Sequence, residues 1–150
     1  MFFCNFSKAF DKGWHQGLLL KLDGYGIRGN LLNWFGSYLQ NRQQRVLIKT
    51  SSSPLSYLSA GVPQGSVFGP LLCIVYINDI AEKLISLCRL FADDTSFNYS
   101  GDDDLQIKSA IDHDLKKLDE WSKTWPMCFN PNKTEIMMFS NTKIPNLNSR

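Results

Sequence analysis

Residues 88–99 have the sequence Cys-Arg-Leu-Phe-Ala-Asp-Asp-Thr-Ser-Phe-Asn-Tyr. Two short β-prone runs flank the adjacent pair Asp93 and Asp94, and such runs separated by two polar residues are typical of a β-hairpin. We predict a hairpin with both carboxylates at its tip. Two like charges side by side repel one another, so they either face water or are offset by a cation. From spacing alone, a solvated polar turn is the simpler alternative.

Strand-like and helix-like patterns alternate before this hairpin. In chain order they predict a strand over residues 2–6, a helix capped by Ser7 and an amphipathic helix capped by Asn30. A hairpin of residues 45–50 and 54–58, joined through 51–53, is predicted next. A loop over residues 60–65, exposed over 61–65, then leads into a buried helix over about 66–84. The loop is indicated by its glycines and proline, and the buried helix by the apolar run that follows it.

After the acidic hairpin, apolar residues recur three and four apart from Asp104 to Trp125. This spacing predicts one long amphipathic helix, which Pro126 ends. Residues 127–130 and 135–140 are predicted strands on either side of a turn. The tail over residues 141–150 is rich in Asn, Pro and Ser, so we expect it to be disordered.

The length and composition are those of one folded domain or a part of one. The 150 residues are 43% hydrophobic and 20% charged, which excludes a disordered tail and a coiled coil. The net charge of +2 is too small to indicate a nucleic-acid binder. The first fifty residues nevertheless carry seven basic and two acidic side chains, a balance compatible with a polyanion or metal partner.

The four cysteines (Cys4, Cys73, Cys88 and Cys128) form no CxxC pair that would suggest a zinc or redox site. The longest apolar stretch, residues 67–77, is far shorter than the roughly 20 residues that a membrane-spanning helix needs. We therefore expect reduced thiols, no membrane partner and an intracellular location, with nucleus and cytoplasm both open.

Four segments resemble, in order, the palm motifs of reverse transcriptases from non-LTR (LINE-type) retrotransposons, the jockey-like branch above all. They are residues 5–11 (Asn-Phe-Ser-Lys-Ala-Phe-Asp) with Trp14 and His15, residues 60–72 (Ala-Gly-Val-Pro-Gln-Gly-Ser-Val-Phe-Gly-Pro-Leu-Leu), residues 91–94 (Phe-Ala-Asp-Asp), and Trp125 with residues 130–135 (Asn-Pro-Asn-Lys-Thr-Glu). The resemblance implies an α+β fold, a polymerase palm with helices packed on one face of an antiparallel sheet. We expect this partial palm domain over residues 1–140, with fingers and thumb missing.

The resemblance also implies catalytic roles. Asp93 matches the metal-binding carboxylate of the polymerase hairpin, and Asp94 a second, more weakly engaged one. Lys133 matches a lysine thought to approach the triphosphate and help protonate pyrophosphate. The expected cofactor is Mg²⁺ or Mn²⁺, because hard divalent cations take carboxylate oxygens.

Three further residues match substrate-binding positions of the family. Phe10 stands where an aromatic gate crowds the ribose 2′-hydroxyl, although its spacing alone would favour a core aromatic. Gln64 matches a residue that contacts the incoming nucleotide and the template. Gly65 permits close approach of the backbone to the substrate.

The first motif departs from the family at Asn5. The family has an aspartate there that bridges two metal ions, whereas asparagine offers one neutral carbonyl oxygen. Asp11 does not replace it, because it lies nearly two helical turns further on. Gly13 and Phe68 also depart from the usual branched apolar residue and leucine. We therefore expect poor metal binding and no catalytic activity in this chain.

The family's reaction is RNA-templated DNA synthesis, in which two divalent metal ions assist transfer of a deoxynucleotide to a primer 3′-hydroxyl. The resemblance thus implies an RNA template, a DNA primer and deoxynucleoside triphosphates as partners. Two functions stay open. One is an RNA-directed DNA polymerase domain, and the other is a non-catalytic relic or adopted fragment that binds nucleic acid or a protein. Asn5 favours the second for the activity of this chain.

Overall fold

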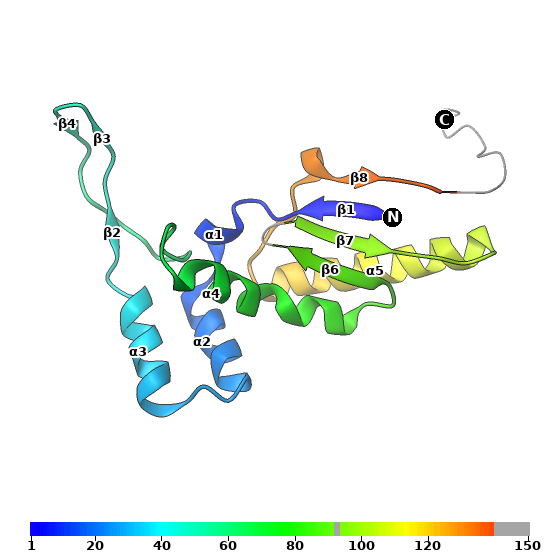
Figure 1. The fold of residues 1–150 in the computed structure, drawn as a ribbon, viewed down its shortest axis with the longest axis horizontal. Helices are drawn as coiled ribbons and strands as arrows, with labels where there is room; N and C mark the ends of the chain where they lie inside the picture. The colour runs from blue at the N-terminus through cyan, green and yellow to red at the C-terminus, as the bar shows by residue number, and fades with distance from the viewer. Residues whose placement is uncertain (92–93, 140–150) are drawn as a thin grey trace.

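The computed structural model describes residues 1–91 and 94–139 (Figure 1). The predicted tail over 141–150 lies outside these residues. In chain order the elements are β1 (Phe2–Asn5), α1 (Ala9–Lys12), α2 (His15–Gly24), α3 (Gly29–Leu39), β2 (Gln43–Gln44), β3 (Leu47–Ile48), β4 (Ser51–Ser52), β5 (Ser56–Tyr57), α4 (Phe68–Ile77), the 3₁₀ helix η1 (Asn78–Lys83), β6 (Leu87–Phe91), β7 (Asp94–Asn98), α5 (Asp104–Thr124), the 3₁₀ helix η2 (Pro131–Lys133) and β8 (Glu135–Ile136).

A four-stranded antiparallel sheet forms the centre of the fold, with the strand order β6-β7-β1-β8. β1 lies between β7 and β8, which come from the later part of the chain (Figure 1). In its register with β7, Phe2 is opposite Phe97 and Asn5 is opposite Asp94. The predicted α+β class with an antiparallel sheet is confirmed.

One face of this sheet is packed against α5, which runs behind it in Figure 1. Cys4 and Phe97 are buried on that face, together with Leu118 and Trp121 of the helix. Side chains alternate between the two faces of a strand, so the strand residues next to Cys4 and Phe97 point to the opposite face of the sheet. That opposite face is open, and it carries the cavity described below.

The prediction of the first helix is wrong in two respects, namely where the helix starts and that it is a single helix. The amide of Ser7 donates to the Cys128 carbonyl at 2.7 Å, so the chain at this point continues the strand pairing and Ser7 does not cap a helix. Lys8 precedes α1 in a left-handed conformation, with φ 56°. Gly13 then separates α1 from α2, and the second helix begins at His15. Two helices stand where the periodicity predicted one.

The next helix, α3, begins one residue before its predicted cap. Asn30 lies within the first turn, and the capping position is taken by Arg28, which makes no side-chain capping bond. After α3, the chain forms a long hairpin in two paired parts, β2 with β5 and β3 with β4. The predicted connection at residues 51–53 is wrong, because Ile48 pairs with Ser51 and leaves Lys49 and Thr50 as the turn.

The two remaining helix predictions have different outcomes. The helix from Asp104 to about Trp125 is confirmed as α5. The buried helix is present, but it changes at Asn78 from the α-helical α4 to the 3₁₀ helix η1. Within residues 1–91 and 94–139, none of the helices has the length and apolar character that crossing a bilayer requires.

The predicted strands near the end of the described chain are much shorter than expected. Only Glu135 and Ile136 form a strand, and Phe129 makes a single isolated bridge with Phe6. Between them Asn130 caps η2, accepting a hydrogen bond from the Asn132 amide. The 3₁₀ turn uses the backbone groups that a longer strand would need for pairing.

Two buried polar networks join elements that are distant in sequence. Lys21 of α2 pairs with Asp79 of η1 at 2.6 Å, and the Trp121 indole donates to the same carboxylate. Burial lowers the pKa of Lys21, although Asp79 opposes the shift. Asp114 of α5 accepts hydrogen bonds from the amides of Ile85 and Ser86 and from the Tyr99 hydroxyl.

Candidate functional site

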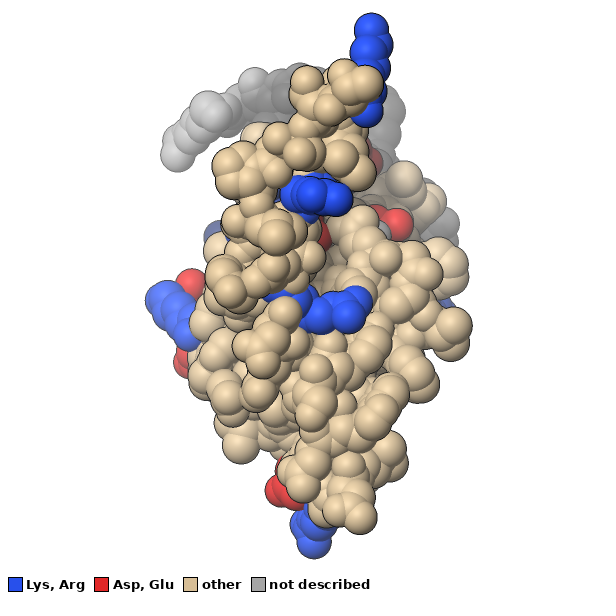
Figure 2. All heavy atoms as spheres, turned by 90° about the vertical axis from the view of Figure 1, so that its left-hand side faces the viewer, with Lys and Arg blue, Asp and Glu red and all other residues tan. Residues whose placement is uncertain are grey.

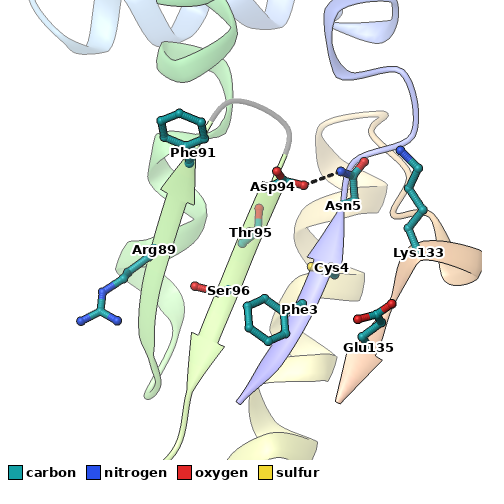
Figure 3. Close-up of a pocket in the computed structure, with 10 residues that line it drawn as sticks. All are labelled: Phe3, Cys4, Asn5, Arg89, Phe91, Asp94, Thr95, Ser96, Lys133 and Glu135. Carbon is teal, nitrogen blue, oxygen red and sulfur yellow. Dashed lines mark hydrogen bonds between the residues drawn. The ribbon is translucent and has the colours of Figure 1, made fainter. Parts of the chain in front are cut away.

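The two polar residues at the ends of β1 and β7 are in direct contact. The Asn5 side-chain amide donates to Asp94 Oδ1 at 2.7 Å (Figure 3). Asn5 is only 8% exposed, whereas Asp94 faces solvent. The family resemblance implies that position 5 lies close to the acidic pair, and the hydrogen bond confirms this for Asp94. Asp94 pairs with Phe91 as the first residue of β7, so it does not lie at the tip of the hairpin. Asp93 lies outside the described residues.

Asn5 and Asp94 line a cavity of about 510 Å³ on the open face of the sheet. Lys133 lines the same cavity and extends toward Asn5 in Figure 3. Its position follows from the backbone, because the Asn130 amide donates to the Asn5 carbonyl at 2.8 Å and so holds η2 against β1. Arg89 and Glu135 also line the cavity, and neither was predicted as a site residue, although Glu135 ends the fourth motif.

The described donors here do not suit a pair of divalent cations. Hard cations require oxygen ligands, carboxylates above all. The Asn5 amide instead directs an N–H at the one carboxylate it contacts, and Lys133 adds a positive charge to the cavity. Among residues 1–91 and 94–139, no group of three His, Cys, Asp or Glu side chains could hold a metal ion.

Cys4 is also among the lining residues of this cavity, although its side chain is buried among residues on the α5 face of the sheet. Burial raises the pKa of its thiol to about 12, and the neighbouring Cys88 adds to the shift. Burial likewise raises the pKa of Cys88 to about 11. Because the thiolate is the nucleophilic form, both thiols are inert at neutral pH.

Two of the predicted substrate-binding residues, Phe10 and Gln64, line a second cavity of about 690 Å³. The Gln64 side-chain amide donates to Asp11 Oδ1 at 2.7 Å. Gly65 is exposed, with φ +75° and open space where a Cβ would lie. The Asp11 contact was not predicted, since no periodic pattern relates residues 53 apart.

The loop before Gln64 is tied to the first helical segment. The amides of Gly61 and Val62 donate to the carbonyls of Gly13 and Phe10 at 2.8 and 2.7 Å. His15 Nε2 lies 2.7 Å from the Gly61 carbonyl and donates to it. Gly61 and Val62 are consequently buried, so the prediction of an exposed loop holds only for its later residues.

Among the described site residues, all except Gly65 line one of two cavities, and these cavities share no lining residue. Asn5, Asp94 and Lys133 line one, and Phe10 and Gln64 line the other. The family resemblance implies that Gln64 points toward the same cleft as Asp93, which lies outside the described residues. Residues 5–10 connect the two cavities along the chain.

Sequence comparison relates the chain to proteins of known type. Residues 1–147 match the family described as reverse transcriptase (RNA-dependent DNA polymerase). Three similar proteins from Drosophila melanogaster are a probable RNA-directed DNA polymerase from transposon BS (33% identical), one from transposon X-element (31%) and the RNA-directed DNA polymerase from mobile element jockey (29%). The matches cover 88%, 92% and 93% of this chain but only 15%, 16% and 16% of those relatives.

Proposed function

This chain belongs to the reverse transcriptase (RNA-dependent DNA polymerase) family, as its resemblance to jockey-like non-LTR elements predicted, and we propose that it is a palm domain that binds nucleic acid. We propose further that it has lost polymerase activity because asparagine replaces the metal-binding aspartate at position 5. Family membership implies a palm-like fold, with which the α+β architecture agrees. The proposed partners are the family's RNA template, DNA primer and deoxynucleoside triphosphates.

The observation that carries the proposal is the hydrogen bond from Asn5 to Asp94. A carboxylate at position 5 would add a full negative charge beside Asp94, and the resulting repulsion would be relieved by a cation. The amide removes both the charge and the repulsion, since its N–H satisfies Asp94 directly. The pair is stable without a metal, and it offers a metal one anionic group fewer.

The substrate roles proposed for the other residues rest on their two cavities. Lys133 would meet phosphate oxygens at the cavity that also contains Asp94. Phe10 and Gln64 would contact the nucleotide or the template from the second cavity, where the Asp11 carboxylate orients the Gln64 amide. Nucleic-acid binding needs these contacts but not the missing carboxylate, so binding persists where nucleotide transfer does not.

The test is primer extension with the 150-residue chain on an RNA template annealed to a fluorescent DNA primer, with Mg²⁺ or Mn²⁺ present. The same hybrid reports binding by fluorescence anisotropy. We expect binding without extension. Extension by the unaltered chain would contradict the proposed loss of activity, and absence of binding would contradict the proposed class of partner.

Asn5→Asp, with Asn98→Asp as a matched control, tests the role of position 5. Both variants add one carboxylate to the sheet, but Asn98 lies at the other end of β7. We expect tighter Mg²⁺ binding by Asn5→Asp alone, measured by isothermal titration calorimetry. Equal affinities in the two variants and the unaltered chain would show that position 5 is not a metal-ligand position.

A further inference from the structure

Residues 24–78 contain no aspartate or glutamate, while they contain four cationic residues. Arg28 is paired with Asp23 at 3.3 Å. The other three are Arg42, Arg45 and Lys49, and all lie on the segment that forms the long hairpin. In the part of the chain that the structure describes, none of the three takes part in an ion pair.

This hairpin, residues 42–58, is here named the hairpin arm. It projects from the helices and the sheet at the left of Figure 1. Most of its apolar side chains face solvent, among them Val46 at 62% exposed and Tyr57 at 74%. An isolated two-stranded hairpin is only marginally stable in water. A projecting arm with exposed apolar and unpaired cationic side chains is the composition expected of a binding surface.

The cations follow one another along the arm. Figure 2, which faces this side of the molecule, shows Lys and Arg side chains at successive heights on an otherwise uncharged ridge. At about 3.3 Å per residue, the spacings from Arg42 to Arg45 and from Arg45 to Lys49 correspond to about 10 and 13 Å. Cationic side chains that converge on one point would suit a compact anion such as a free triphosphate. Cationic side chains spaced in a row along the arm instead suit an extended anion with repeating charges.

Lys49 occupies the turn at a conformational cost. Its φ is 53°, in the left-handed region that favours glycine or asparagine. Lysine therefore places a positive charge at the outermost point of the arm, where local backbone preference would select another residue. At the base of the arm, the Arg42 guanidinium lies 5.6 Å from the centre of the Tyr38 ring, which supports that side chain.

We propose that the hairpin arm binds the sugar-phosphate backbone of a nucleic acid, with Arg42, Arg45 and Lys49 each neutralising a phosphate. Tyr57 and the exposed aliphatic side chains of the arm lie against sugars and bases. The inference rests on the proposed function in one respect, namely that nucleic acid is the partner of this chain. It adds a surface on the arm that lies outside both cavities.

The experiment measures binding of the 150-residue chain to a fluorescein-labelled 20-base-pair RNA–DNA hybrid at 50–200 mM KCl. In the triple variant Arg42→Gln, Arg45→Gln and Lys49→Gln, each lost phosphate contact should reduce the slope of log K against log salt by about 1, or about 3 in total. At the lowest salt we expect affinity to fall by about 10- to 100-fold. Far-UV circular dichroism verifies that the variant is folded.

Two further variants make the result specific. Lys108→Gln, Lys116→Gln and Lys123→Gln on α5 remove the same total charge elsewhere, and they should leave the slope of the unaltered chain unchanged. Arg42→Lys with Arg45→Lys keeps the charges and should retain most of the affinity. Should the triple variant misfold, Arg45→Gln alone serves, with an expected slope change of about 1.

An unchanged slope and affinity in the folded arm variants would overturn the inference and leave a protein partner as the occupant of the arm. Equal losses in the α5 control would overturn it as well, because they would show a general charge effect. A primer-extension assay distinguishes failure of this inference from failure of the proposed loss of polymerase activity. Arm-dependent binding together with robust extension would support the arm and contradict the proposed loss of activity.

Discussion

The Asn5 amide and the Asp94 carboxylate, 89 residues apart in sequence, are joined by a 2.7 Å hydrogen bond at the paired ends of β1 and β7. Each residue is fixed by its strand register, so the contact follows from the sheet itself. The bond satisfies Asp94 with a neutral donor at the place where the family resemblance implies metal-binding carboxylates. Changing this one contact should therefore alter both stability and metal response.

Asn5→Asp should destabilise the fold when no divalent cation is present. The substitution replaces a hydrogen bond with two adjacent carboxylates, at a cost of about 1–2 kcal/mol near solvent. Thermal unfolding in EDTA should show a lower Tm than that of the unaltered chain. Millimolar Mg²⁺ should raise the Tm of Asn5→Asp alone, since a ligand that binds only the folded state stabilises it. A Tm unresponsive to Mg²⁺ in both proteins would contradict the prediction.

Asp114→Asn should reduce stability at neutral pH. Burial would raise the pKa of this carboxyl, but hydrogen bonds from Ser86 and Ile85 outweigh it, so the pKa lies below its ordinary value. A lowered folded-state pKa contributes stability above the unfolded-state pKa, and this contribution is lost as pH falls through the folded-state value. We expect a cost of about 2–3 kcal/mol at pH 7.

The measurement for Asp114 is urea unfolding at several pH values from 7 to 2.5. The difference between Asp114→Asn and the unaltered chain should shrink as the pH falls below the unfolded-state pKa of about 3.9 and through the lower folded-state pKa, since the unfolded chain then binds a proton before the native carboxyl does. Tyr99→Phe removes one hydrogen bond to the same carboxylate and should cost less, about 1 kcal/mol. A pH-independent difference would show that the Asp114 charge is not what stabilises this contact.

Lys21→Met should destabilise the fold by leaving Asp79 without its cation. Lys21 is 7% exposed, contacts Asp79 at 2.6 Å and lies 4.0 Å from the centre of the Trp125 ring. Removing one partner of a buried ion pair costs about 3–5 kcal/mol, and less where the other partner is part-exposed. The double variant Lys21→Met with Asp79→Asn should recover part of the loss. Additive costs in this double-mutant cycle would contradict energetic coupling between the two side chains.

Gly61→Ala should be far more destabilising than Gly65→Ala. Both glycines have positive φ, +85° and +75°. A Cβ at Gly61 would lie 2.7 Å from the Phe10 carbonyl oxygen and from Asp11 Cα, whereas a Cβ at Gly65 would meet open space. The conformational cost common to both is about 1–2 kcal/mol, and the backbone clash adds to it at Gly61. Chemical denaturation of the two variants gives the comparison, and equal costs would show that the loop can move away from α1.

Local sequence patterns were sufficient to predict an element where its buried residues repeat with the period of a helix or a strand. The apolar spacing from Asp104 to Trp125 predicted α5, and the β-prone runs around the acidic pair predicted β6 and β7. Periodicity reports which side of an element is buried, and α5 is buried along one side only. The four ordered motifs likewise indicated the family before any fold was known.

Contacts between distant segments were decided by the tertiary structure. The Ser7 amide donates a hydrogen bond to the Cys128 carbonyl. Because this bond continues the strand pairing, the helix expected after Ser7 begins only at Ala9, and it ends before Gly13. The Gln64 side chain is oriented by Asp11, and the turn of the arm is placed at Lys49 by strand register.

The sequence by itself therefore determined the family, the secondary-structure classes and the asparagine at position 5. Only the tertiary structure decided what that asparagine does, because its partner Asp94 is supplied by strand pairing and not by any local pattern. A hydrogen bond depends on the separation and angle of two atoms, and these are set when β1 enters the sheet between β7 and β8.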